Sequence, residues 1–190
     1  MLLKLFDSGM KPNPTLLLTV AMLYSNPQMG RFLLENGASA SDRDIVSALQ
    51  PNKNIPASIF YKQNFAVPFN APESPACFAI GAAPHLLPLL LEKGANPDGK
   101  NLMGRSALIL AVMKNDLKSV KILLEHNANI ENDDGFLSPL ALAVKLDKEP
   151  IVRFLLSRGA NPNGKGNPLQ MAKLKGNKEM ISLLTQAGAH

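Results

Sequence analysis

The sequence predicts an all-α fold, a solenoid of stacked helix-turn-helix units joined by short hairpin-like fingers. The first observation is a leucine-rich segment that occurs four times. Its copies end at Gly94, Asn127, Gly159 and Gly188, at intervals of 33, 32 and 29 residues. A period in this range is typical of repeat architectures. The second observation is a capping residue before the apolar runs, and the third is a set of turn-rich links between units. Such stacks bury apolar faces only against neighbouring units, so they present broad surfaces without an enclosed pocket.

The clearest unit runs from Gly104 to Asn129. Its first helix begins after Ser106, whose hydroxyl is well suited to cap a helix. Asn115 and Asp116 then interrupt the apolar pattern and predict a short turn. A second helix follows, with apolar residues every three to four positions and therefore one buried face. These residues are Leu117, Val120, Leu123 and Leu124.

The other units repeat the same start and stop signals. A capping side chain precedes a proline at three helix starts, namely Ser74, Ser138 and Asn167. Proline at the first helical position loses no hydrogen bond and has its φ preset. Residues that tolerate a left-handed conformation stand at the helix ends, namely Gly94, Asn127, Gly159 and Gly188. We therefore expect the same helix pair in each unit.

Three segments carry a resemblance to a known family: Ser106–Ala111, Ser138–Ala143 and Asn167–Ala172, each followed by a leucine-rich second helix and a turn. They resemble ankyrin repeats. The resemblance implies an ankyrin-repeat solenoid whose fingers and first helices form a concave, protein-binding face. Ankyrin repeats usually carry a histidine at one position of the first helix. This sequence has Ile109, Ala141 and Gln170 at that position instead. A hydrogen bond within each repeat is therefore expected to be missing.

We predict a single ankyrin-repeat domain over residues 1–190, with helices at Leu16–Tyr24 and Pro27–Glu35 in its second segment. The segments are a partial repeat at 1–13, a repeat at 14–40, a degenerate repeat with a proline-rich insertion at 41–73, repeats at 74–101, 102–131 and 132–163, and a C-terminal capping repeat at 164–190.

A partial first repeat exposes an apolar face, which suggests either that the chain is a piece of a longer protein or that another element covers this end. The apolar stretch 51–75 is either packed on the stack or a binding loop.

Charge and hydropathy narrow the kinds of partner. The formal net charge is +5, but the lysines are dispersed and are not interleaved with aromatic residues, so nucleic-acid binding is not expected. The longest apolar runs are far shorter than the roughly 20 residues that span a bilayer, so no membrane insertion is expected. The single cysteine, Cys77, excludes an internal disulfide and is expected in the core. A cytoplasmic location follows, or delivery into a host cell if the chain is a bacterial effector.

No group of residues has the spacing of a catalytic, cofactor or metal site. The histidines His85, His126 and His190 are not spaced with other ligands. The sequence Gly164-Lys165-Gly166 lacks the spacing of a phosphate loop and predicts a turn. Acid pairs fall on expected finger tips and helix starts, where a solvated role is expected. We therefore expect neither an enzyme nor a bound cofactor.

The resemblance implies that the binding face is built from fingers and first helices. On the fingers it includes Leu102, Met103, Arg105, Asp133, Asp134, Phe136 and Leu137. Along the first helices it includes Leu23, Tyr24, Met113, Lys114, Lys145, Leu146, Leu174 and Lys175. Finger tips are normally polar, so the apolar finger residues form either a contact patch or a locally packed cluster.

The expected function is that of a protein–protein interaction module that binds another protein through this face, without catalysis of its own. Two alternatives belong to other classes. One is the substrate-recruiting domain of a larger enzyme, such as a secreted bacterial effector. The other is a structural scaffold that self-associates through its open N-terminal end.

Overall fold

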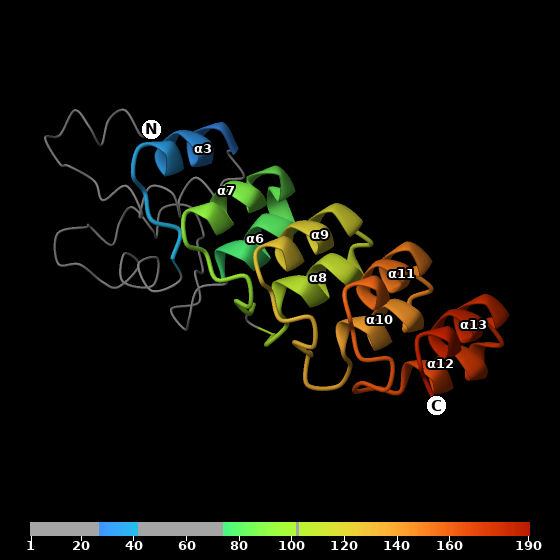
Figure 1. Cartoon of the computed structure of the whole chain (residues 1–190). Coiled ribbons are helices and arrows are strands. Elements are labelled where there is room, and N and C mark those ends of the chain that lie inside the picture. Colours follow the sequence, from blue (N-terminus) through green and yellow to red (C-terminus); the bar gives the residue numbers. More distant parts are fainter. Residues whose placement is uncertain (1–26, 42–73, 102) are drawn as a thin grey trace, which may run out of the picture. The chain divides into compact units, whose positions relative to one another are not determined.

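The computed structural model describes residues 27–41, 74–101 and 103–190, which are helices and connecting turns (Figure 1). The chain divides into two compact units, Met1–Asn96 and Pro97–His190. No β-strand occurs in the described ranges, and one isolated antiparallel bridge joins Lys100 to Ser106. The predicted all-α class is therefore confirmed. None of the described helices is long and apolar enough to span a membrane.

The described part of the first unit consists of α3 (Pro27–Glu35), α6 (Pro75–Ala82), the 3-10 turn η1 (Pro84–Leu86) and α7 (Leu87–Glu92). Helix α3 matches the predicted second helix at these residues. It contacts α7 and η1, and α6 also packs on both. The fully or almost fully buried side chains of this unit include Leu34, Cys77, Ile80, Leu86, Leu87 and Leu90.

One predicted helix cap is wrong. Ser74 stands at the start of α6, but its side chain makes no capping hydrogen bond, and its buried hydroxyl oxygen has no partner among the described residues. The start of α6 therefore depends on Pro75 at its first position, where the fixed φ of proline favours a helix. The two helices of this repeat are separated by η1, which begins at Pro84, whereas Gly81 lies within α6 and Pro88 within α7.

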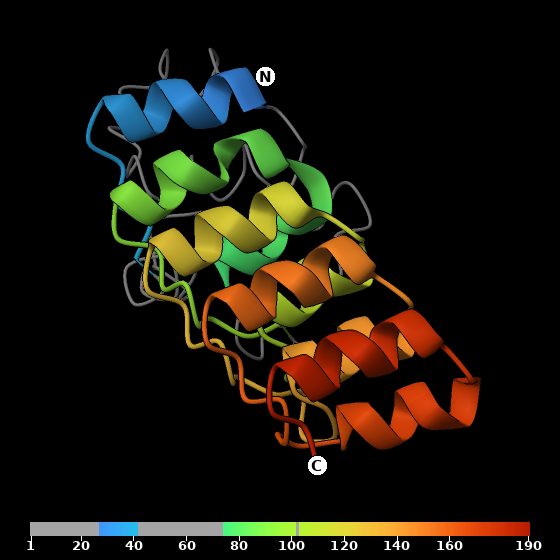
Figure 2. The same cartoon turned by 45° about the vertical axis from the view of Figure 1, so that its right-hand side comes forward.

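The second unit contains three helix pairs. The first helices of the pairs lie in one layer and the second helices in another (Figure 2). Within each pair the two helices contact each other, and α10 also contacts both α8 and α12. The pairs are α8 (Ala107–Met113) with α9 (Leu117–Glu125), α10 (Pro139–Lys145) with α11 (Glu149–Ser157), and α12 (Pro168–Lys175) with α13 (Lys178–Gln186).

The capping residues explain where these first helices begin. The side-chain oxygen of Ser106 accepts a hydrogen bond from Ile109 N at 3.3 Å, and that of Ser138 accepts one from Ala141 N at 3.2 Å. Asn167 caps α12 through a bond from Gln170 N at 3.0 Å. Each bond satisfies one of the N–H groups that a helix start leaves without a partner. These three predicted caps are confirmed.

Left-handed residues end the second helices, as predicted. Gly94, Gly159 and Gly188 have φ values of 96°, 85° and 92°, and Asn127 has 62°. The following alanine then donates its N–H back into the helix, as from Ala128 to Leu123 O at 2.9 Å. This geometry satisfies carbonyl groups that the helix end would otherwise leave unpaired.

The core of the second unit lies between the two helix layers. Its fully or almost fully buried side chains include Leu108, Ile109, Val112, Leu123, Leu140, Val144, Ile151 and Leu155. Ile109 and Ala141 stand where ankyrin repeats usually carry histidine, and both are completely buried. Apolar packing therefore replaces the missing hydrogen bond in these two repeats. Gln170, at the third such position, is exposed.

A polar contact recurs between consecutive repeats. Asp98 Oδ1 accepts a hydrogen bond from Asn129 N at 2.8 Å, and Glu131 Oε1 accepts one from Asn161 N at 2.7 Å. In each case a side chain after one second helix holds the backbone after the next second helix. Asn163 repeats the arrangement by accepting from His190 N at 3.0 Å. We call these three bonds the inter-repeat clamps.

Substitution of Gly166, the glycine of the last finger, tests how closely neighbouring repeats pack. Gly166 and Gly159 both have positive φ, but a Cβ on Gly166 would lie 2.5 Å from Leu137 Cδ2, whereas a Cβ on Gly159 meets nothing within 4 Å. Both alanine variants should lose about 1–2 kcal/mol through backbone strain. Gly166→Ala should lose roughly 1–3 kcal/mol more through overpacking. Urea unfolding measures the difference, and equal losses would contradict the close packing.

The clamp at Glu131 allows a matched pair of variants. Glu131→Ala removes the acceptor for Asn161 N, whereas Glu131→Gln keeps a side-chain oxygen that can accept the same bond. We expect the alanine variant to lose about 1 kcal/mol of unfolding free energy. The glutamine variant should retain most of it. Urea unfolding of both variants measures this, and similar losses in the two would show that the hydrogen bond contributes little.

Candidate functional site

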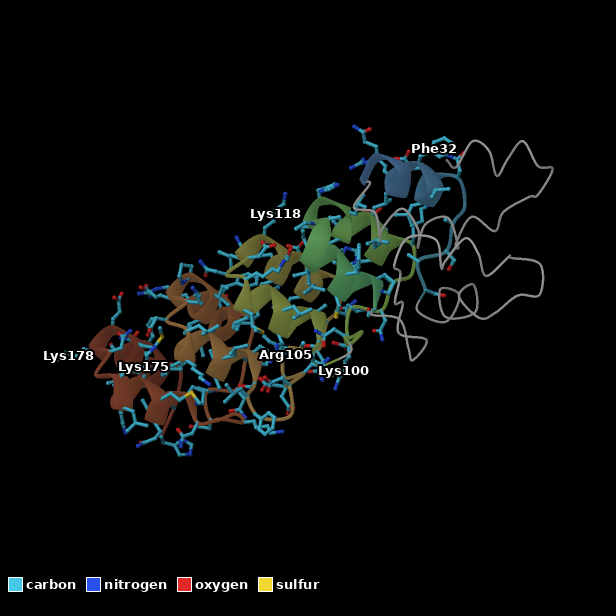
Figure 3. All side chains as sticks on the ribbon, turned by 180° about the vertical axis from the view of Figure 1, so that it is seen from behind. Phe32, Lys100, Arg105, Lys118, Lys175 and Lys178 are labelled. Atoms are coloured by element: carbon cyan, nitrogen blue, oxygen red, sulfur yellow. The ribbon has the colours of Figure 1, made fainter. Side chains whose placement is uncertain are left out.

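The predicted site residues that the structure describes lie on two fingers and at the C-terminal ends of first helices, all in the second unit. Leu23, Tyr24 and Leu102 lie outside the described residues. Figure 3 shows Arg105 at the base of the first finger, and the antiparallel bridge at this finger joins Lys100 to Ser106.

The first finger is shaped by Asn101. Its Oδ1 atom accepts hydrogen bonds from Met103 N at 2.9 Å and from Arg105 N at 3.0 Å. Its own N–H donates to Arg105 O at 2.9 Å. These bonds hold the tip while the Met103 side chain extends into solvent, with 74% of its surface exposed. The Arg105 guanidinium lies beside it, with Nη1 3.8 Å from Met103 Sδ.

The second finger is shaped by its two aspartates. Asp133 Oδ1 accepts a hydrogen bond from Gly135 N at 2.7 Å. Asp134 Oδ1 accepts bonds from Phe136 N at 3.0 Å and from Leu137 N at 2.8 Å. The backbone of this finger is therefore held from within. The Phe136 ring is left 81% exposed at its tip.

The two apolar residues of the second finger have different surroundings. Leu137 is partly buried, and its Cδ2 atom lies so close to the neighbouring finger that a Cβ on Gly166 would be 2.5 Å away. Leu137 therefore packs within the stack. Phe136 does not share this environment, because most of its surface faces solvent. The apolar finger residues were expected to form either a contact patch or a locally packed cluster. The surroundings of Leu137 fit local packing, and those of Phe136 fit a contact patch.

Both aspartates of the second finger have lowered pKa values. The backbone hydrogen bond from Gly135 and the hydrogen bond from Lys165 lower the pKa of Asp133. Its Oδ2 atom lies 3.1 Å from Lys165 Nζ. For Asp134, burial raises the pKa, but the N–H groups of Leu137 and Phe136 and the charge of Arg105 outweigh it, so the net shift is downward. Both side chains are therefore ionised at neutral pH.

The first helices contribute an exposed pair of residues at each C-terminal end. Counted from the capping residue, the pairs are equivalent in three consecutive repeats: Met113 with Lys114, Lys145 with Leu146, and Leu174 with Lys175. All six side chains are exposed. Each pair thus joins one apolar and one cationic side chain.

A polar contact fixes the last of these helix ends. Lys175 Nζ donates to Lys145 O at 2.8 Å and forms an ion pair with Asp147. The hydrogen bond from Lys175 is the main cause of the lowered pKa of Asp147, with Asn177 adding to it. The Lys175 side chain therefore bridges two consecutive repeats at this edge of the surface.

Sequence reasoning did not identify two residues that organise this surface. Asn101 lies in one of the turn-rich links between units, where an asparagine side chain can accept a hydrogen bond from the backbone two residues on. Lys165 was assigned to a turn, and its pairing with Asp133 depends on the distance between fingers, which no local pattern gives. Within the described ranges, no cluster of His, Cys, Asp and Glu could hold a metal ion.

The acid response of the second finger can be tested at Asp134. Folding lowers the pKa of Asp134, so its carboxylate stabilises the fold at pH values above about 3.9, the pKa of an aspartate in the unfolded chain. This stabilisation is lost as the pH falls through the lower pKa of the folded state. Asp134→Asn keeps an acceptor but does not titrate. Urea unfolding from neutral pH to about pH 2.5 should show the difference between wild type and variant shrinking below about pH 4. A difference independent of pH would contradict this assignment.

Comparisons with known proteins agree with this geometry. Residues 76–166 match the family model of ankyrin repeats in three copies. The chain is 35% identical over 115 residues to mouse ankyrin repeat and SOCS box protein 14, a match that covers 60% of this chain and 16% of the mouse protein. It is 40% identical over 111 residues to the putative ankyrin repeat protein FPV031 of fowlpox virus, covering 52% of this chain and 32% of that protein.

A solved structure shares the fold. An ankyrin repeat domain from Acinetobacter baumannii AYE aligns with a TM-score of 0.67 and 26% identity, covering 91% of this chain and 81% of that domain. The chain spans less than a third of the length of the curated relatives described above, at 16% and 32%. The matched repeats, the relatives and the shared helix pairs lead to one conclusion: residues 76–166 of this chain are ankyrin repeats.

Proposed function

We propose that this chain binds a partner protein through the fingers and first-helix ends of its second unit. Ankyrin repeats are generally protein–protein interaction modules, which gives the proposal its class. The finer assignment concerns the surface. It comprises Met103, Arg105, Met113, Lys114, Asp133, Asp134, Phe136, Lys145, Leu146, Leu174 and Lys175.

The observation that carries the proposal is the exposure of large apolar side chains on internally braced fingers. Phe136 is 81% exposed and Met103 is 74% exposed, although the backbone beneath each is held by side-chain hydrogen bonds. Aromatic residues and methionine are enriched at protein interfaces, where an apolar anchor enters a pocket of the partner. A braced loop also loses less conformational entropy on binding than a loose one. Asn101 and Asp134 supply that bracing.

A second candidate is the recruitment domain of a larger protein, including an enzyme. It is favoured by the length of the relatives, since the match covers only 16% of mouse ankyrin repeat and SOCS box protein 14. In this case the same surface would hold a substrate for a catalytic region elsewhere in the same polypeptide. A catalytic domain encoded in the same reading frame would support this candidate.

The proposal is tested by changing both anchors. Met103→Asp combined with Phe136→Asp should abolish capture of the partner from a cell lysate, because each aspartate would have to be desolvated at an apolar contact. Quantitative mass spectrometry of the captured proteins measures the loss. Both residues are mostly exposed, so the thermal unfolding midpoint should change little.

The matched control places the same charges on the second-helix layer. Ser182→Asp combined with Thr185→Asp changes two exposed residues of α13 and should leave capture unchanged. If the anchor variant stays folded by circular dichroism and still captures the same proteins as wild type, the proposed surface is wrong. If only the control loses capture, the partner binds the second helices instead.

A further inference from the structure

We propose that Met103 is a reversible oxidation site, whose sulfoxide is held by Arg105 and weakens the partner contact of the first finger. This inference rests on the proposed function and adds a means of regulating the same surface. The oxidant is hydrogen peroxide. Met103 and Arg105 lie two positions apart on one finger of the second unit.

The first step is the access of a dissolved oxidant to sulfur. Met103 is 74% exposed, and the other described methionine side chains are all less exposed. Met113 is 42% exposed, Met171 is partly buried and Met180 is 2% exposed. Methionine is oxidised where its thioether can meet the oxidant. Met103 should therefore react before these other residues.

The reaction requires only the thioether and the peroxide. A lone pair of Met103 Sδ attacks one oxygen of hydrogen peroxide, so that an S–O bond forms while the O–O bond breaks. The departing hydroxide takes the proton of the transferred oxygen and leaves as water. Sulfur is thereby oxidised by two electrons, and the peroxide is reduced. The product is methionine sulfoxide, which sulfoxide reductases convert back to the thioether.

The second step is the position of Arg105. Its Nη1 atom donates a hydrogen bond to Met103 Sδ over 3.8 Å. A sulfoxide oxygen lies about 1.5 Å from sulfur and accepts a charge-assisted hydrogen bond of about 2.8 Å. With an angle of about 120° at this oxygen, the donor nitrogen lies about 3.8 Å from sulfur. The distance between Nη1 and Sδ therefore already suits the oxidised side chain.

The backbone of the finger keeps the two side chains close together. Asn101 Oδ1 accepts hydrogen bonds from Met103 N at 2.9 Å and from Arg105 N at 3.0 Å. A guanidinium carries five N–H donors, so a bond from Nη1 to the sulfoxide leaves others for further partners. The contact with sulfur thus does not require that Arg105 be otherwise unpaired.

Oxidation changes the chemistry of the proposed anchor. A thioether is apolar, whereas a sulfoxide is polar, so burying it against an apolar partner surface is unfavourable. The bond to Arg105 also ties the oxidised side chain to its own finger. Phe136, on the second finger, has no sulfur and keeps its apolar ring. The partner contact is therefore weakened at one of its two anchors.

Peptide mapping by mass spectrometry tests the site itself. The folded protein is treated with increasing amounts of hydrogen peroxide, and the gain of one oxygen is measured at each methionine. We expect Met103 to be oxidised at least about tenfold faster than Met180 and roughly twofold faster than Met113. Treatment with the two sulfoxide reductases, one for each sulfur epimer, and dithiothreitol should restore the thioether.

Side-chain NMR of isotope-labelled arginine tests the role of Arg105. Its guanidinium resonances should shift when the wild-type protein is oxidised, because a sulfoxide oxygen is a stronger acceptor than a thioether sulfur. Met103→Leu keeps an apolar side chain of similar volume but cannot be oxidised. In this variant the same treatment should leave the Arg105 resonances unchanged. Met113→Leu is the matched control and should respond as wild type does.

Capture of partner proteins tests the consequence. The protein is oxidised, the peroxide is removed, and the proteins captured from a lysate are quantified by mass spectrometry. Oxidised wild type and oxidised Met113→Leu should each capture at least about threefold less than before treatment. Met103→Leu should capture equally before and after. Met103→Gln, which is polar without oxidation, should capture less without any peroxide, and circular dichroism checks that each variant is folded.

Several results would overturn this inference. They are oxidation of Met103 no faster than that of Met180, Arg105 resonances that do not respond to oxidation, and equal loss of capture by oxidised wild type and oxidised Met103→Leu. If Met103→Gln weakens capture but peroxide leaves Met103 unmodified, this inference falls while the proposed function stands. If Met103→Gln captures as wild type does, Met103 is not an anchor, and the proposed function fails at this residue as well.

Discussion

The second unit depends on apolar packing between two layers of short helices. None of its helices is long enough to be stable alone, because each has only seven to nine residues. Each instead buries leucine, isoleucine or valine against its partner and against the next repeat, and a fully buried side chain of this kind contributes about 1.5–3 kcal/mol. Capping bonds and left-handed turns set where each helix starts and stops, so that the apolar faces meet. The inter-repeat clamps then fix one repeat against the next.

Because the helix layers form the core, the finger tips are available for the partner contact proposed above. The core between the layers needs no side chain from the finger tips, so Met103 and Phe136 remain exposed while local hydrogen bonds hold the backbone beneath them. The first helices start where these fingers end, and each carries one apolar and one cationic residue at its far, C-terminal end. The side chains of such a surface can change without altering the buried layers.

The sequence predicted local features well because they depend on neighbouring residues. Caps at Ser106 and Ser138 and the helix end at Asn127 follow from side-chain chemistry at a known spacing. Ser74 has the same local pattern as Ser138, yet it makes no capping bond, so the pattern alone does not decide the outcome. The pairing of Asp133 with Lys165 and the packing of Leu137 beside Gly166 could not be predicted, because both depend on the distance between fingers of consecutive repeats. The exposure of Phe136 was likewise open, since a finger can hide an aromatic ring or present it.

Hydrogen–deuterium exchange on the complex with a captured partner tests the central claim most directly. The claim is that the fingers and first-helix ends form the contact surface, so amides of residues 103–105, 133–137 and the last turns of α8, α10 and α12 should gain protection on binding. The exposed faces of α9, α11 and α13 should exchange as in the free protein. Protection confined to those second helices, with the fingers unchanged, would contradict the account.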